Sequence, residues 1–117
     1  MNLFGTVLNG LGAALQLHEA RHRVIAENLA NAETPGYRAR RLEFQDELRR
    51  AFDGEPISKT SVEAEVDRHA RVNADRNSVD LDTEMARMSE NALRTVALSR
   101  LLSRKYATLR AAIQGVR

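Results

Sequence analysis

The sequence predicts an all-α fold, in which long N- and C-terminal helices pack as a coiled-coil pair joined by a charged, partly irregular middle segment. Apolar residues near both ends of the chain recur at alternating steps of four and three, the spacing of a coiled-coil seam. The composition, 43% hydrophobic with only 4% aromatic residues, suits slender helices better than a large mixed core. The 117 residues suffice for one assembly domain, divided into segments 1–33, 34–76 and 77–117.

Segment 1–33 is predicted to be an axial helix with its apolar residues on more than one side. The main seam consists of Phe4, Leu8, Leu11, Leu15, His18, His22, Ile25 and Leu29. Among these, Leu8, Leu15 and Ile25 are expected to carry helix packing. Asn31 is expected to end the helix, because asparagine tolerates the left-handed backbone of a C-cap.

A tight turn is predicted directly after this helix. Pro35 cannot continue a helix and disfavours the α conformation at Thr34, and Gly36 readily adopts positive φ. Thr34-Pro35-Gly36-Tyr37 therefore fits a type II turn that delivers Tyr37 at a fixed place.

The middle segment, residues 34–76, offers few apolar anchors after the turn. A short amphipathic helix is expected from Leu42 or Phe44 to Phe52, ended by Asp53-Gly54-Glu55-Pro56. From Ile57 to Val66 the chain fits either an extended or a disordered state, and the segment as a whole resembles a linker that orders on contact with neighbours.

Segment 77–117 contains the second long helix, with Asp80 or Asp82 as its N-cap and Gly115 as its stop. Its predicted seam runs through Leu81, Met85, Met88, Ala92, Thr95, Ser99, Leu102, Tyr106, Leu109, Ile113 and Val116. The positions expected to carry packing are Val79, Leu81, Met85, Met88, Leu102, Tyr106, Leu109 and Ile113. Because both helices carry apolar residues on several sides, packing between subunits is expected, either as an open helical polymer or as a closed four-helix dimer.

Catalytic and metal-binding interpretations find little support. His18-Glu19-Ala20-Arg21-His22 matches the H-E-x-x-H pattern of zinc peptidases, but Asn28 stands where the metzincin pattern requires a third histidine. Glu43 is a candidate third ligand only if the chain turns back at Pro35, and both histidines fit seam positions of a helix pair. The chain has no cysteine and no glycine-rich phosphate loop. A non-enzyme without a metal or a cofactor is therefore expected. The arginines of the C-terminal helix could follow nucleic-acid phosphates, but a solvated face explains them better.

Two stretches resemble the bacterial flagellar axial proteins, which are the rod, hook and hook-associated subunits. Residues 23–37 contain the Asn-Leu-Ala-Asn-Ala-x-Thr-Pro-Gly-Tyr core of their N-terminal signature, whose residues Asn28, Leu29, Asn31, Thr34, Pro35, Gly36 and Tyr37 form the candidate assembly motif. Residues 77–106 resemble the C-terminal helix of one short rod member more than that of a second. The family often shows Gly-Asn before the Val-Asp pair, where this chain has Asp75-Arg76-Asn77-Ser78.

The resemblance implies a structural subunit of the proximal rod in the flagellar basal body. Such a protein would self-assemble with other rod proteins into a hollow, torque-transmitting shaft that spans the periplasm. Its implied partners are copies of itself, the other rod proteins, the rod-to-membrane-ring adaptor, the MS ring and the flagellar type III export gate. Export without a cleaved signal peptide is implied too, with no cofactor, small-molecule substrate or nucleic acid.

Overall fold

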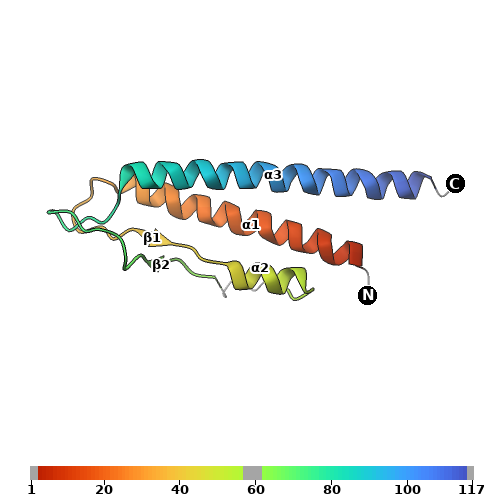
Figure 1. The fold of residues 1–117 in the computed structure, drawn as a ribbon, viewed down its shortest axis with the longest axis horizontal. Helices are drawn as coiled ribbons and strands as arrows, with labels where there is room; N and C mark the ends of the chain where they lie inside the picture. The colour runs from red at the N-terminus through yellow and green to blue at the C-terminus, as the bar shows by residue number, and fades with distance from the viewer. Residues whose placement is uncertain (1–2, 57–61, 116–117) are drawn as a thin grey trace.

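The molecule is a long, thin stack of three layers with the N-terminal helix in the middle. The structure, a computed structural model, describes residues 3–56 and 62–115. In chain order its elements are α1 (Leu3–Ala30), β1 (Arg40–Arg41), α2 (Gln45–Phe52), β2 (Glu65–Val66) and α3 (Leu81–Gln114). The molecule measures 68 × 23 × 16 Å. Helix α3 lies along one side of α1, while α2, β1 and β2 lie along the opposite side of α1 (Figure 1). This arrangement confirms the predicted all-α class.

The long helices α1 and α3 run antiparallel and form most of the molecule. Helix α3 begins after Asp80, whose carboxylate accepts a hydrogen bond from the Thr83 backbone N–H at 3.3 Å, so Asp80 is the N-cap. It ends at Gln114 with Gly115 as the C-cap, as the sequence predicts. Within the part of the chain that the structure describes, no helix is long and apolar enough to cross a membrane.

The face that α3 turns toward α1 differs from the predicted seam. Glu84 and Asn91 are the buried residues of α3, and both form hydrogen bonds to α1. Helical spacing places Met88, Thr95, Leu98, Leu102 and Leu109 on the same face. Leu81, Met85, Tyr106 and Ile113, which the predicted seam includes, are instead more than half exposed. The face of α3 that contacts α1 is rotated relative to the predicted seam. Two of its positions hold the polar residues Glu84 and Asn91, so a pattern of apolar residues cannot identify them.

The middle segment lies along α1 rather than acting as a loose linker. Strands β1 and β2 pair antiparallel, with Arg40 opposite Val66 and Arg41 opposite Glu65. Helix α2 agrees with the predicted short helix, and the described parts of residues 38–76 are ordered against α1 of the same chain. That this segment orders on contact with neighbouring subunits stays a prediction. Hydrogen bonds of the main chain hold much of this segment, and a count of apolar anchors cannot reveal them. Residues 57–61 lie outside the described residues.

A small apolar core holds the middle segment against α1. Leu17 of α1 meets Leu42 and Phe44, and the half-buried side chains of Val24, Leu48, Val62 and several alanines surround this cluster. Within the described residues, α1 contacts both α2 and α3, whereas α2 and α3 do not contact each other. Helix α1 is therefore the common support of the two outer layers.

Candidate functional site

The predicted turn after α1 is present with the predicted geometry. The Tyr37 backbone N–H donates to the Thr34 carbonyl at 3.2 Å, and Gly36 has a φ of 77°. Positive φ at the third residue, after a proline, defines a type II turn. The side of this turn formed by Thr34, Pro35 and Gly36 is exposed.

Asn31 caps the helix by a different route from the predicted one. Within the described residues, Arg76 is the non-glycine residue with positive φ, so the expectation of a left-handed Asn31 is wrong. The Asn31 side-chain amide instead donates to the Glu27 carbonyl at 2.8 Å, and its side-chain oxygen accepts from the Thr34 hydroxyl at 3.1 Å. The Glu27 carbonyl also accepts from the Asn31 backbone N–H at 3.1 Å, so the Asn31 side chain adds a second hydrogen bond to the last helical turn.

Asn77, just before α3, fastens the turn from inside the molecule. Its side-chain amide donates to the carbonyls of Asn31 at 2.8 Å and Thr34 at 2.7 Å, and its oxygen accepts from the Val79 N–H at 2.7 Å. The residue is fully buried. Since each hydrogen-bonding group of this amide finds a partner, Asn77 ties the end of α1 to the start of α3 without an unsatisfied polar atom. Its partners Asn31 and Thr34 lie 46 and 43 positions away, so no local sequence signal indicates this role.

Neighbouring main-chain bonds extend the connection along the segment after the turn. Gly36 donates its N–H to the Asp75 carbonyl at 2.9 Å, and Ser78 donates to the Tyr37 carbonyl at 3.0 Å. The Ser78 hydroxyl oxygen accepts from the buried Ala39 N–H at 2.8 Å. Residues 36–39 are therefore bonded directly to residues 75–78.

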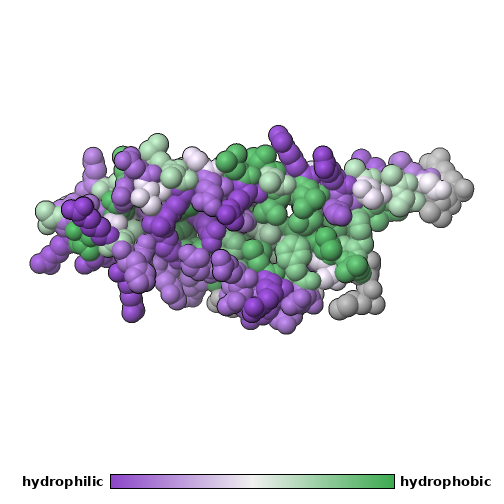
Figure 2. Space-filling view, viewed as in Figure 1, coloured by the Kyte–Doolittle hydropathy of each residue, from purple (hydrophilic) through white to green (hydrophobic). Residues whose placement is uncertain are grey.

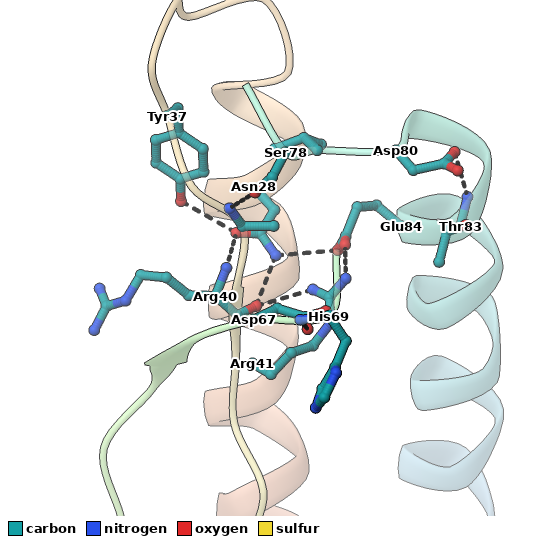
Figure 3. Close-up of polar contacts among 12 residues, drawn as sticks. Asn28, Tyr37, Arg40, Arg41, Asp67, His69, Ser78, Asp80, Thr83 and Glu84 are labelled. Atoms are coloured by element: carbon teal, nitrogen blue, oxygen red, sulfur yellow. Dashed lines mark hydrogen bonds and ion pairs between the residues drawn. The ribbon is translucent and has the colours of Figure 1, made fainter. Parts of the chain in front are cut away.

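Asn28 is the centre of a second set of polar contacts, one turn earlier in α1 (Figure 3). Its side-chain oxygen accepts from the Tyr37 hydroxyl at 3.1 Å and from the Arg40 N–H at 3.0 Å. Its amide donates to the Arg40 carbonyl at 2.9 Å and to Glu84 Oε2 at 3.2 Å. Tyr37 thus points into its own molecule, and burial, together with the negative charge of Glu27, raises the pKa of Tyr37.

Glu84 brings α3 into this set as a fully buried carboxylate. It pairs with the Arg41 guanidinium of β1 and accepts from Asn28, and Arg41 Nε lies 3.3 Å from Asp67 Oδ2 (Figure 3). A buried carboxylate needs a partner charge and hydrogen bonds to offset its lost hydration, and both are supplied here. We call Asn28, Tyr37, Arg41, Asp67, Asn77 and Glu84 the polar clamp.

A separate buried contact joins the middle of α1 to α3. His18 Nδ1 lies 2.7 Å from Asn91 Oδ1, and the Asn91 amide donates to the His18 carbonyl at 2.8 Å. The Phe44 ring meets His18 edge-on at 5.0 Å, while the Arg21 guanidinium lies 4.0 Å from the centre of that ring. Burial lowers the pKa of Arg21 from its ordinary value.

The histidine geometry argues against the zinc-peptidase pattern. His18 turns toward Asn91, whereas His22 is exposed, and Glu43, the candidate third ligand, lies 3.7 Å from Arg21. No group of three potential metal ligands occurs in the described ranges 3–56 and 62–115. The pair of histidines is thus part of an ordinary helix surface, with one member buried in the α1–α3 seam.

Known proteins share both the signature and the overall length of this chain. The sequence model of the family described as "Flagella basal body rod protein" matches residues 8–38. FlgB of Cereibacter sphaeroides is 32% identical over 114 residues, which cover 87% of this chain and 89% of that protein. FlgB of Bacillus subtilis is 28% identical over 98% of both chains, and FlgB of Salmonella typhimurium is 34% identical over 69% of this chain and 73% of its own.

The chain belongs to the FlgB family of flagellar basal body rod proteins. This membership confirms the resemblance to the axial proteins and gives the chain a structural role in the rod of the basal body. The prediction that it is not an enzyme is confirmed on the same ground. These relatives are FlgB proteins, in agreement with the C-terminal resemblance, and not the second short rod protein, FlgC.

In this FlgB-family chain the candidate assembly motif and the candidate packing residues have different surroundings. Asn28 and Tyr37 of the motif belong to the polar clamp, Asn31 caps α1, Leu29 is half-buried, and the rest of the turn is exposed. Of the packing residues, Ile25 and Val79 are buried, whereas Leu8, Leu15, Met88, Leu102 and Leu109 are half-buried. Leu81, Met85, Tyr106 and Ile113 are exposed and require other partners to be covered.

Four residues of central importance were not among the sequence candidates: Arg41, Glu84, Asn77 and Asn91. All four are polar, and their partners are remote in the chain, up to 73 positions away for Asn91 and His18. A sequence signal existed for one contact only, since His18 stands in an apolar seam where an unpaired imidazole would be costly.

Proposed function

We propose that this chain self-assembles with copies of itself and with other rod proteins into the proximal part of a hollow, torque-transmitting rod. A shaft needs subunits that resist bending and twisting. The polar clamp and the His18–Asn91 contact tie α1, α3 and the middle segment together at two levels. Kinship with FlgB proteins supports the rod as the place of assembly.

The observation that carries self-assembly is the uncovered apolar surface of α3. Large apolar side chains are exposed along its whole length: Leu81, Met85, Leu93, Val96, Leu101, Tyr106 and Ile113. Leu93 is 73% exposed and Ile113 is 66% exposed. Figure 2 shows hydrophobic residues gathered over the N-terminal part of α1 and the middle of α3, with hydrophilic residues over α2 at the lower edge. An apolar surface of this extent is typical of a protein that is covered by neighbours.

The remaining parts of the proposal come from the family resemblance. We expect contacts with the rod-to-membrane-ring adaptor and the MS ring, passage through the flagellar type III export gate, and a rod that spans the periplasm. Export without a cleaved signal peptide belongs to the same expectation from the family resemblance.

A charge on the exposed surface of α3 tests self-assembly without disturbing the subunit itself. In Leu93→Glu a carboxylate replaces a side chain that has little contact within the subunit, so the helical circular dichroism of the purified chain should stay unchanged. A flagellated strain that carries this variant as its sole copy should lose swimming, because neighbours cannot bury the charge. Ser89→Glu, at an exposed polar position of the same helix, is the control and should swim.

Swimming of the Leu93→Glu strain tests the contact surface, and sedimentation of the unmodified chain separates the rod from a closed helical dimer. Normal swimming of the Leu93→Glu strain would contradict the proposed contact surface. A discrete, stable dimer of the purified unmodified chain at micromolar concentration, with no larger species in sedimentation velocity, would favour the closed four-helix bundle.

A further inference from the structure

Charged side chains without an ion-pair partner in the described residues lie at the same level of the molecule on its two outer layers, α2 and α3. Phe52, at the end of α2, packs on Gly10 so closely that a Cβ atom there would lie 2.4 Å from the ring. A Cβ atom on Gly54 would lie 3.9 Å from Thr6 Cγ2. The end of α2 and the residues after it therefore lie beside the first turns of α1.

The antiparallel alignment of α1 and α3 identifies the part of α3 at this level. The Asn28–Glu84 and His18–Asn91 contacts fix the alignment. Continued at equal rise along both helices, it brings Thr6 opposite roughly residue 104. Asp53, Glu55 and Arg104 thus occupy one level of the molecule, with α1 between the acidic and the basic groups.

Among the described residues on the α2 side, the charges at this level that lack an ion-pair partner are negative. The arginines of α2 are used internally, since Arg49 pairs with Asp46 at 3.2 Å and Arg50 pairs with Glu47 at 3.3 Å. Asp53 and Glu55 are exposed, and neither forms an ion pair within the described residues.

On the α3 side the free charges are positive. No acidic residue follows Glu90 in the sequence. Arg100 comes nine positions after Asn91, which at about 3.6 residues per turn places it on the side of α3 opposite to α1, and Arg104 follows one turn later. Both arginines are exposed, and neither has an ion-pair partner in the described part of the chain.

We propose that a second copy of this chain docks side by side in the same orientation, with Arg100 and Arg104 of one copy against Asp53 and Glu55 of the next. The inference rests on the proposed function and specifies the contact it uses. Such a contact joins two different surfaces, so each added copy presents a fresh one and the assembly stays open. A closed dimer through α3 would instead bring like-charged arginines together, which is unfavourable.

The charges set the partner and the orientation, while apolar contacts supply most of the affinity. Exposed ion pairs contribute little each and are screened by salt. Leu93 and Leu101, both exposed on α3, lie within two turns of Arg100 and provide apolar surface to be covered. Association should therefore weaken as salt rises but respond more strongly to reversal of charge.

Two single-cysteine variants test the contact, because the chain has no cysteine of its own. Full-length Arg104→Cys and Asp53→Cys chains are purified, mixed in equal amounts and oxidised, and dimers are counted on a non-reducing gel. A disulfide between different variants should form in the mixture and should decrease several-fold at high salt. Each variant alone should give little dimer. In the proposed contact position 104 of one copy meets position 53 of the next, so the single cysteine of each variant lies beside an unmodified residue.

Each other result would overturn the inference. Dimers of Arg104→Cys alone would show that α3 meets α3 in a closed pair. Absence of the mixed dimer would show that the two surfaces do not meet. That result is expected if Arg100 and Arg104 bind an anionic membrane or DNA instead of a second copy. If the mixed dimer is absent while the Leu93→Glu strain still fails to swim, rod self-assembly stands and only this contact fails.

Charge exchange supplies an independent check on the same surfaces. For this check the first partner carries Arg100→Cys in place of Arg104→Cys, which leaves position 104 free. Adding Arg104→Glu to that partner should decrease the mixed dimer. Glu55→Arg in the other partner should restore it, because the pair regains opposite signs. No restoration would mean that the two charges are not neighbours.

Discussion

Arg76 holds a backbone conformation that its side chain disfavours. Its φ is 65°, and its N–H donates to the Asn73 carbonyl at 2.9 Å, closing the short turn that leads into Asn77. A side chain with a Cβ atom is strained in this left-handed region, whereas glycine is not. This turn places the Asn77 side-chain amide within hydrogen-bonding distance of the carbonyls of Asn31 and Thr34, and these bonds offset the backbone strain at Arg76. Arg76 belongs to the stretch in which the chain departs from the Gly-Asn pattern of the axial proteins.

Arg76→Gly should therefore stabilise the protein. Relief of the strained backbone outweighs the greater freedom of glycine in the unfolded chain, so we expect the free energy of unfolding to rise by about 0.5–1 kcal/mol. Urea denaturation followed by circular dichroism measures the change. Arg71→Gly is the control, since Arg71 is exposed and has no positive φ, and it should leave stability equal or lower. Equal effects of the two substitutions would contradict the assigned strain.

At this scale the sequence was informative where the causes are local. The type II turn follows from Pro35 and Gly36 alone, and its predicted geometry is confirmed. The Asp80 cap is equally local. Glu84, in contrast, was not among the candidate residues, because its partners Arg41 and Asn28 lie 43 and 56 positions away. Buried polar contacts over such distances leave no pattern in a single sequence.

Among the elements, α1 has to serve two different neighbours, and its glycines show how. Gly10 lies under the Phe52 ring, so α2 packs directly on the α1 backbone at this point. Gly12, half a turn away, has no atom within 4 Å of the position of an added Cβ. The first glycine is therefore needed for close approach, whereas the second is a helix position at which a better helix former is tolerated.

The same substitution at these two glycines should have different consequences for stability. Gly12→Ala should raise the free energy of unfolding by up to about 1 kcal/mol through helix propensity. Gly10→Ala gains the same propensity but displaces Phe52, so it should be less stable than Gly12→Ala by about 1 kcal/mol or more. Denaturation of both variants, repeated in a Phe52→Ala background, measures the difference. In that background the two glycines should respond alike; a persistent difference would show that the Phe52 ring is not the cause.

The predictability of the elements follows the strength of their periodic pattern. Helices α1 and α3 are long enough for the 4-3 repeat to identify them, although the α1-facing side of α3 was misplaced because Glu84 and Asn91 occupy it. Helix α2 was visible from Phe44, Leu48 and Phe52. The strands β1 and β2 contain two residues each, mostly charged, and alternation cannot be recognised over such a length.

At the scale of the whole molecule, the polar clamp joins all three layers at the end that carries the turn. Asn28 belongs to α1, Arg41 to β1 and Glu84 to α3, and Asp67 follows β2. Because the apolar core of Leu17, Leu42 and Phe44 lies on the α2 side of α1, it holds the middle segment but not α3. We infer that the clamp lets the turn, the strands and the end of the α1–α3 pair open together.

Loss of the Glu84 charge should consequently loosen the whole turn end of the molecule. In Glu84→Gln the Arg41 guanidinium keeps Asp67 but loses its buried carboxylate partner, so the free energy of unfolding should decrease by about 2 kcal/mol or more. Native-state hydrogen exchange should quicken together at Gly36, Arg40 and Ser78, whose N–H groups are bonded around the clamp. Glu90→Gln breaks only an exposed pair with Arg94 on the same helix and should change stability by less than about 0.5 kcal/mol. Faster exchange confined to the first turns of α3 would show instead that the three layers open independently, since a shared clamp cannot release one of them alone.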